Sequence, residues 1–199
     1  MSEINVVLFD LGGVLLELRD PYQTFGLAEA DYDFHARWLA SPTVRAYEKG
    51  QISVSEFGST MAAELQLGVD GAEFLRRFDS WIEGVYAGAH ELLDRVPAGV
   101  QKAVLSNINE LHWQYVAADE GFTRRIEKFF LSYQIGMIKP DPETFTYVTR
   151  ILGCQPKEIL FIDDNPVNIS AGLNAGFNAV HARGLSQVTA ALQSFGIVD

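Results

Sequence analysis

Six polar side chains whose types could together carry out phosphoryl chemistry stand directly after apolar runs or just before a predicted helix. They are Asp10, Ser106, Asn107, Lys139, Asp163 and Asp164. Separated carboxylates with backbone carbonyls nearby suit Mg²⁺, which prefers oxygen ligands in octahedral geometry. A serine hydroxyl, backbone N–H groups and a lysine suit a phosphate dianion. An acid held between a metal and a lysine stays ionised, so the set predicts phosphoryl transfer through an aspartyl-phosphate.

Taken singly, each of these residues has a plainer interpretation. Asp163-Asp164 could be a solvated turn, Lys139 a surface lysine, and Asp10 the end of a strand at an Asp-Gly turn. Ligands of open parallel sheets bind outside the carboxyl ends of the strands, where these residues would converge. The set is therefore a stronger signal than any member.

The elements that must position these residues alternate along the chain. Strands are predicted at 4–9, 100–105, 129–133, 159–162 and 178–181, and helices at 89–96, 109–120, 141–152, 165–176 and 189–195. Asp141 and Asn165, each followed by proline, are suitable N-caps for two of the helices. Strands that alternate with helices predict an α/β fold, a Rossmann-like parallel sheet with helices on both faces.

Residues 20–86 have a different character and predict helices with no strand. Ser53 and Glu56 form a capping-box pattern, and Phe74, Phe78 and Trp81 lie at helical spacing. Such a stripe is typical of a core. We therefore expect a helical insertion after the first strand, with residues 1–19 and 87–199 forming the sheet domain.

Composition excludes several classes of function. The formal net charge of this 199-residue chain is −11 and there is no basic run, which argues against nucleic-acid binding. No segment predicts a signal peptide or a membrane span. Cys154 is the only cysteine, which fits a reducing, cytoplasmic location. His90 and His181 have no metal-ligand spacing, so no zinc site is expected, and neither a dinucleotide fingerprint nor a P-loop is present.

Four motifs resemble those of the haloacid dehalogenase-like superfamily, in the branch with a helical cap inserted after the first motif. They are Phe9-Asp10-Leu11-Gly12-Gly13-Val14, Leu105-Ser106-Asn107, Lys139-Pro140-Asp141-Pro142 with Phe145, and Phe161-Ile162-Asp163-Asp164-Asn165. The match spans nearly the whole chain. Residues 20–86 would then be an all-helical cap, and the form of the first motif is similar to a sub-branch that contains sugar-phosphate phosphatases.

The resemblance implies a role for each site residue. Asp10 would be the nucleophile and a ligand of Mg²⁺, with the backbone carbonyl of Gly12 and the carboxylate of Asp164 as further ligands. The transferring phosphoryl group would be held by Ser106, the Asn107 backbone and Lys139. Asp163 and Asn168 would hold the metal-binding and phosphate-binding side chains in place without contacting the metal or the substrate themselves.

Gly12 departs from the family pattern, because phosphatases of this superfamily usually carry an Asp there that protonates the leaving group and then activates water. Such general acid–base help is typically worth a factor of about 10²–10⁴. Candidates for a replacement are His112, for which a surface or capping role is the plainer interpretation, and the cap residues His35, Arg37, Arg45, Glu48 and Lys49.

These patterns predict a Mg²⁺-dependent phosphatase whose partner is a small phosphorylated metabolite, with no nucleic acid and no membrane. One alternative is a metal-independent 2-haloacid dehalogenase with the same nucleophile. Another, motivated by Gly12, is a catalytically impaired relative that binds a phosphorylated ligand or a protein partner. The substrate and the oligomeric state are not encoded in any readable motif.

Overall fold

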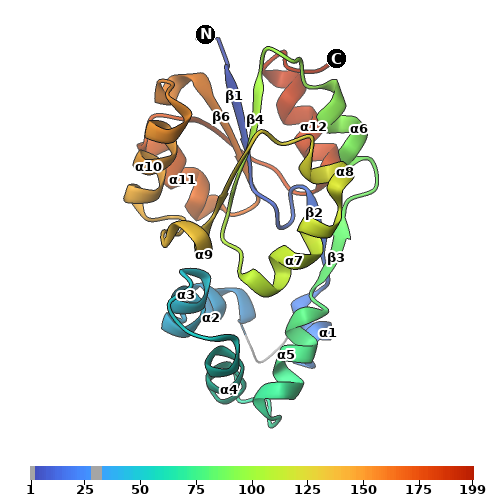
Figure 1. Cartoon of the computed structure of the whole chain (residues 1–199), viewed down its shortest axis with the longest axis vertical. Helices are drawn as coiled ribbons and strands as arrows, with labels where there is room; N and C mark the ends of the chain where they lie inside the picture. The colour runs from blue at the N-terminus through green and yellow to red at the C-terminus, as the bar shows by residue number, and fades with distance from the viewer. Residues whose placement is uncertain (1–2, 28–32) are drawn as a thin grey trace.

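A five-stranded parallel sheet lies at the centre of the computed structural model, which describes residues 3–27 and 33–199 (Figure 1). Its spatial order is β5-β4-β1-β6-β7 and every neighbouring pair is parallel. The strands are β1 (Val6–Phe9), β4 (Gln101–Ser106), β5 (Lys128–Leu131), β6 (Ile159–Asp163) and β7 (Asn178–His181). The predicted Rossmann-like α/β fold is confirmed, and β1, from which the chain winds outward in both directions, is the central strand.

Helices cover both faces of the sheet because the strands are apolar on both sides. In β1 the side chains of Val7 and Phe9 pack into one core cluster and those of Val6 and Leu8 into another. The first cluster is completed mainly by α6 (Ala89–Arg95), α7 (Glu110–Ala118), α8 (Glu120–Thr123) and α12 (Gly184–Ser194), the second by α10 (Pro142–Leu152) and α11 (Pro166–Asn174). Packing on both faces therefore fixes the position of β1 and of Asp10, which follows it.

Within the described residues between β2 and β3, five helices form a separate helical unit, drawn in the lower half of Figure 1. They are α1 (Pro21–Phe25), α2 (Phe34–Ala40), α3 (Pro42–Glu48), α4 (Val54–Glu64) and α5 (Gly71–Asp79). This unit has its own aromatic core, in which Phe25, Phe57 and Phe74 are completely buried. Ser53 caps α4, accepting a hydrogen bond from the Glu56 N–H at 3.2 Å.

The prediction that residues 20–86 contain no strand is wrong at its end. Strand β3 (Ile82–Val85) pairs antiparallel with β2 (Leu16–Leu18), and this two-stranded ribbon joins the helical unit to the sheet domain. β3 is short, contains Gly84 and is only partly buried, so it lacks the run of apolar residues that marks the central strands.

Three other element boundaries differ from the predictions. The helix expected at 109–120 breaks at Asp119, whose side chain accepts a hydrogen bond from the Phe122 N–H and begins α8. The strand expected to reach residue 133 stops at Leu131, and α9 (Ser132–Ile135) follows it. The last helix begins at Gly184 rather than at 189.

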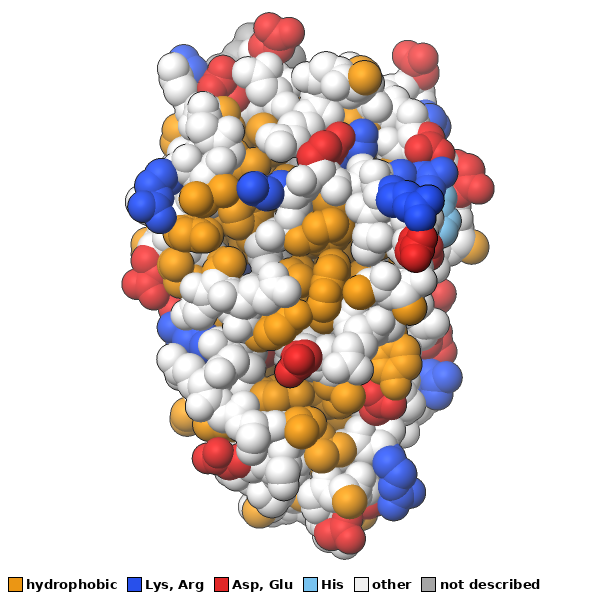
Figure 2. Space-filling model, viewed as in Figure 1, with side chains coloured by type: hydrophobic (Ala, Val, Ile, Leu, Met, Phe, Trp, Pro, Cys, Tyr) orange, Lys and Arg blue, Asp and Glu red, His pale blue; other side chains and the backbone are white. Residues whose placement is uncertain are grey.

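Figure 2 shows that hydrophobic side chains gather in the middle of this face, around an acidic side chain, and that most of the acidic and basic side chains lie towards its margins. Over residues 3–27 and 33–199, no helix is both long enough and apolar enough to cross a bilayer.

Candidate active site

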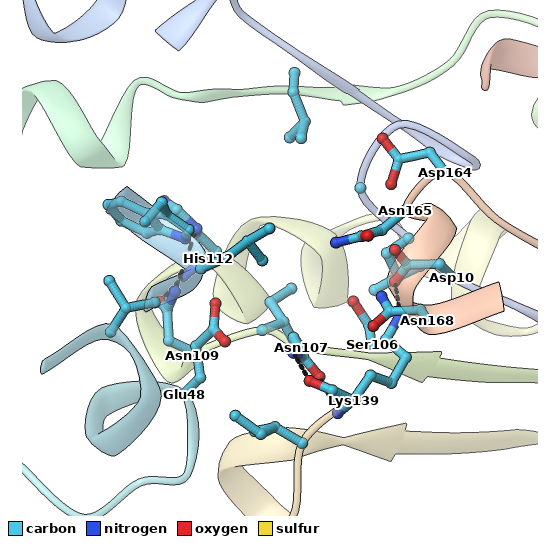
Figure 3. A pocket seen from close by; sticks show the side chains of 18 of the residues that line it. Asp10, Glu48, Ser106, Asn107, Asn109, His112, Lys139, Asp164, Asn165 and Asn168 are labelled. Atoms are coloured by element: carbon cyan, nitrogen blue, oxygen red, sulfur yellow. Dashed lines mark hydrogen bonds and ion pairs between the residues drawn. The ribbon is translucent and has the colours of Figure 1, made fainter. Parts of the chain in front are cut away.

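The carboxyl ends of β1, β4 and β6 open into one cavity between the sheet and the helical unit. Its volume is about 330 Å³, in the range of small-molecule sites. Asp10, Gly12, Ser106, Asn107, Lys139, Asp164 and Asn168 all line it. Figure 3 shows Asp10, Asp164 and Asn168 on one side of the cavity and Glu48 and His112 on the other. Of the predicted site residues, only Asp163 lies behind the cavity wall.

Lys139 connects two of the buried carboxylates. Its Nζ lies 2.8 Å from Oδ1 of Asp10 and 2.6 Å from Oδ2 of Asp163, and its side chain is almost completely buried. An ammonium group has three N–H donors, so one remains after these two ion pairs. That donor is free to bind an anion in the cavity.

Burial and the neighbouring charges together set the ionisation of Asp10 and Lys139. Burial raises the pKa of Asp10 to about 7; Lys139 opposes the rise, while Asp163 and Asp164 add to it. Burial alone would lower the pKa of Lys139, but the two carboxylates raise it above its usual value. Lys139 is therefore a fixed positive charge.

Asp10, Asp163 and Asp164 each place a carboxylate oxygen within 4.8 Å of the others. When all three are ionised, Lys139 offsets only one of their charges. Burial and then Asp163 raise the pKa of Asp164, which shows the same shortage of positive charge. A donor set of carboxylate oxygens with excess negative charge fits a hard divalent cation such as Mg²⁺. Gly13 has φ +70°, and a Cβ there would collide with the Asp164 carboxylate.

The loop that carries Lys139 is fixed by side chains from two other segments. The Asn107 side chain donates to the Lys139 carbonyl and accepts from its N–H, both at 2.9 Å. Thr144 donates to the Ile138 carbonyl at 2.7 Å. The Asn107 side chain is thus engaged in positioning Lys139, a role that the sequence did not reveal.

Asp163 is held by three hydrogen bonds from two groups at the start of α11. Nδ2 of Asn168 donates to both of its oxygens at 3.0 and 3.2 Å, and the Asn165 N–H donates at 2.8 Å. Asn165 also caps α11 as predicted, accepting from the Val167 N–H at 2.9 Å. These bonds fix the carboxylate that orients Lys139.

Asp141 is the N-cap residue of α10 by position, but its side chain makes no capping hydrogen bond. It instead forms ion pairs with Arg45 and, at 3.4 Å, with Nζ of Lys49, both from the end of α3. Arg45, which hydrogen-bonds to Asp141, holds the pKa of that carboxyl below its usual range. The predicted N-cap position is confirmed, but the side chain does not cap the helix, because its carboxylate joins the helical unit to the loop of Lys139.

His112 is buried, so a surface position for it is excluded. Its Nε2 lies 2.8 Å from the Phe78 carbonyl and its Nδ1 3.3 Å from Nδ2 of Asn109. Burial lowers its pKa, and the hydrogen bond to Phe78 opposes this shift only in part. A neutral ring that donates to Phe78 and accepts from Asn109 has no nitrogen left for a substrate.

The helical unit contributes both apolar and charged groups to the cavity. Trp38, Phe78 and Trp81 line it, although the helical spacing of Phe78 and Trp81 in the sequence indicated only a place in a core. Of the cap candidates, Arg45 and Glu48 line the cavity, whereas Arg37 and Lys49 do not. The side chain of His35 lies outside what the structure describes.

This chain is similar to known proteins in fold and, at 25–30% identity, in sequence. A model of the haloacid dehalogenase-like hydrolases matches residues 4–176. The D-ribitol-5-phosphate phosphatase of Bacteroides thetaiotaomicron is 30% identical over 197 residues, covering 87% of this chain and 89% of that protein. Hexitol phosphatase A of Escherichia coli is 25% identical, covering 87% and 80%. A solved enzyme of the same family from B. thetaiotaomicron, in complex with magnesium and inorganic phosphate, aligns with a TM-score of 0.73 and 27% identity over 90% of this chain and 94% of that one.

Proposed function

The chain belongs to the haloacid dehalogenase-like hydrolases, and on that premise we propose that it is a Mg²⁺-dependent phosphatase acting on a small phosphorylated metabolite in the cytoplasm. The observation that carries the proposal is the convergence of Asp10, Asp164 and Lys139 on one cavity at the carboxyl edge of the sheet. The excess of negative charge among these groups suits a cation, which a metal-independent dehalogenase does not need.

In this proposal Asp10 is the nucleophile. Its carboxylate attacks phosphorus, the bond to the leaving oxygen breaks, and water then releases phosphate from the aspartyl-phosphate. The remaining N–H of Lys139, the hydroxyl of Ser106 and the backbone of Asn107 bind the phosphoryl oxygens. Asp163 and Asn168 keep Lys139 and its neighbours in place.

Asp10, Asp164 and the Gly12 carbonyl are the proposed holders of the metal. When bound, Mg²⁺ supplies positive charge that offsets the charge of the phosphoryl group. The proposed cap is residues 20–86, and the proposed sheet domain is residues 1–19 and 87–199. The helical unit lies within this cap, covers the cavity and keeps bulk water out.

The substrate class follows from the cavity and from the relatives. The cavity has room for a small metabolite, and two similar proteins are named D-ribitol-5-phosphate phosphatase and hexitol phosphatase A. We therefore propose a sugar phosphate or a sugar-alcohol phosphate as the substrate.

The test is phosphate release from pentitol, hexitol and sugar phosphates and from p-nitrophenyl phosphate, with Mg²⁺ and with a chelator. Asp10→Asn removes the nucleophile and should reduce release to background. Asp70→Asn is the matched control, because Asp70 is the exposed N-cap of α5 and asparagine caps a helix equally well. Binding of these compounds without turnover would instead favour a catalytically impaired binding protein.

A further inference from the structure

A phosphatase must supply a proton to the leaving alkoxide and remove one from the attacking water. Gly12, the residue two positions after Asp10, has no side chain with which to do this. Among the residues that line the cavity, the titratable or charged side chains are Asp10, Arg45, Glu48, His112, Lys139 and Asp164. One of these six, or a group beyond the cavity, must carry the proton.

Five of the six are occupied. Asp10, Lys139 and Asp164 are assigned to attack, phosphoryl binding and metal binding. His112 uses both ring nitrogens within the protein. Arg45 pairs with Asp141, and a guanidinium does not give up a proton in proteins. Glu48 is the remaining group.

Glu48 is the last residue of α3 and lies on the face of that helix that lines the cavity. Ser41, Val44 and Glu48 stand at i, i+3 and i+7 along this face and all line it. Figure 3 shows the carboxyl of Glu48 pointing into the cavity, opposite Asp10 and Asp164. A group on the helical unit faces the substrate from the side opposite the nucleophile, where the leaving oxygen of an in-line displacement must be.

The residues beside Glu48 fix its position from both directions. Tyr47 is buried in the core of the helical unit, where its ring stacks on Phe57 with centroids 4.0 Å apart. Lys49, with Arg45, pairs with Asp141 on the opposite side. The backbone at Gly50 then packs so closely on the Tyr133 carbonyl that a Cβ at residue 50 would lie 2.7 Å from it.

The carboxyl of Glu48 has no hydrogen-bond or ion-pair partner within the part of the chain that the structure describes. Burial raises its pKa to about 7, with Lys139 and Arg45 opposing the rise and Asp10 adding to it. The C-terminal end of a helix also disfavours a negative charge. Near neutral pH this group can therefore both give and take a proton.

We propose that Glu48 is the general acid and base of the phosphatase reaction, an inference that rests on the proposed function. In the first half, the Asp10 carboxylate forms a bond to phosphorus, the bond to the substrate oxygen breaks, and the proton of Glu48 passes to that oxygen to give the alcohol. In the second half, water attacks phosphorus, its proton passes to Glu48, and the bond to Asp10 breaks to release phosphate. Glu48 ends the cycle protonated, as it began.

The test compares wild type, Glu48→Gln and the control Glu64→Gln, which makes the same change on an exposed part of α4. Each is assayed with an alkyl phosphate that the wild type hydrolyses and with p-nitrophenyl phosphate, whose phenolate leaves without a proton. We expect Glu48→Gln to lower kcat/KM for the alkyl phosphate about 10²–10⁴-fold and for the aryl phosphate much less. The control should match the wild type.

A second readout separates proton transfer from a structural role. With p-nitrophenyl phosphate, Glu48→Gln should release about one nitrophenolate per active site in a burst and then turn over slowly, because hydrolysis of the aspartyl-phosphate has lost its base. Equal losses for both substrates without a burst, or kcat/KM values within threefold of wild type, would overturn the inference. If the glutamine variant does not fold, Glu48→Ala, which also removes the carboxyl, carries the same comparison, with the same two results deciding.

Failure of the proposed function gives a different result. In that case the wild type and the Glu64→Gln control release phosphate from none of the sugar, sugar-alcohol and aryl phosphates assayed, and the inference falls with the function. Activity in the wild type together with an unaffected Glu48→Gln variant would reject only the role of Glu48.

Discussion

Lys139 is the residue on which the charge balance of the site depends, since its ammonium lies between the buried carboxylates of Asp10 and Asp163. Removing one partner of a buried ion pair typically costs about 3–5 kcal/mol, because the remaining charges stay buried without compensation. We expect Lys139→Met to lower the free energy of unfolding by about that amount at pH 8, measured by urea denaturation. Lys128→Met, which changes an exposed lysine, is the control. A Lys139→Met protein as stable as the wild type would show that the Lys139 ammonium does not compensate the buried charges of Asp10 and Asp163.

Glu48 should make stability depend on pH in a specific direction. Its pKa is raised from 4.5 to about 7 in the folded protein, mainly by burial. Between these values the folded state binds a proton that the unfolded state does not, so its contribution to stability is complete below pH 4.5 and is lost as pH rises through 7. Glu48→Gln should therefore be more stable than wild type at pH 8, by up to about 3 kcal/mol, and not at pH 4.

Thermal unfolding across this pH range in Mg²⁺-free buffer measures the effect, with Glu64→Gln, the same change at an exposed residue, as the control. A constant difference between Glu48→Gln and wild type from pH 4 to pH 8 would mean that the Glu48 carboxyl is not perturbed.

At the scale of elements, α3 is the contact between the helical unit and the loop of Lys139. An exposed ion pair is typically worth about 0.2–1 kcal/mol, and the Arg45 side chain in this pair is 44% exposed. We expect Asp141→Asn to lower kcat/KM about two- to fivefold at low salt, because α3 and Glu48 are held less firmly, and to change overall stability little.

The effect of Asp141→Asn should shrink as salt screens the pair. Asp94→Asn is the matched control: it breaks the pair of Asp94 with Arg125, which lies entirely within the sheet domain. Equal kinetic effects of the two substitutions would contradict a specific role for α3.

Strong hydrophobic patterns predicted the strands that form the parallel sheet, whereas elements with weak patterns could not be predicted. β1 is apolar throughout and is followed by Asp10, and β6 is apolar up to Asp163 at its end. The sequence therefore predicted both where these strands lie and at which end of them the site is. β3 and the start of α12 could not be found in this way, because they are partly buried and their glycines, Gly84 and Gly184, obscure the periodicity.

At the scale of the whole molecule, the position of the helical unit over the sheet could not be predicted. Local sequence indicated its helices, but the contacts that orient it join residues far apart in the chain, such as Arg45 with Asp141 and His112 with Phe78. The residues at the strand ends could therefore be proposed from sequence. The choice of Glu48 among five cap candidates required the structure.

Metal binding should stabilise the whole protein. A ligand at 100 times its Kd adds about 2.7 kcal/mol to the free energy of unfolding, which for a chain of this size raises Tm by roughly 5–10 °C. We expect such a shift with Mg²⁺ for the wild type and for Asp70→Asn. Asp164→Asn, which removes one carboxylate of the cluster, should lose most of it. An undiminished shift in Asp164→Asn would move the metal site elsewhere.

The most direct test of the central claim, that Asp10 carries the phosphoryl group, is mass spectrometry of acid-quenched protein after mixing with a turned-over substrate and Mg²⁺. The account predicts a phosphoryl group on the peptide that contains Asp10, removable by hydroxylamine, absent from Asp10→Asn and more abundant in Glu48→Gln than in wild type. Phosphate release at an undiminished rate by Asp10→Asn, or turnover by the wild type with the phosphoryl group on another residue, would contradict it.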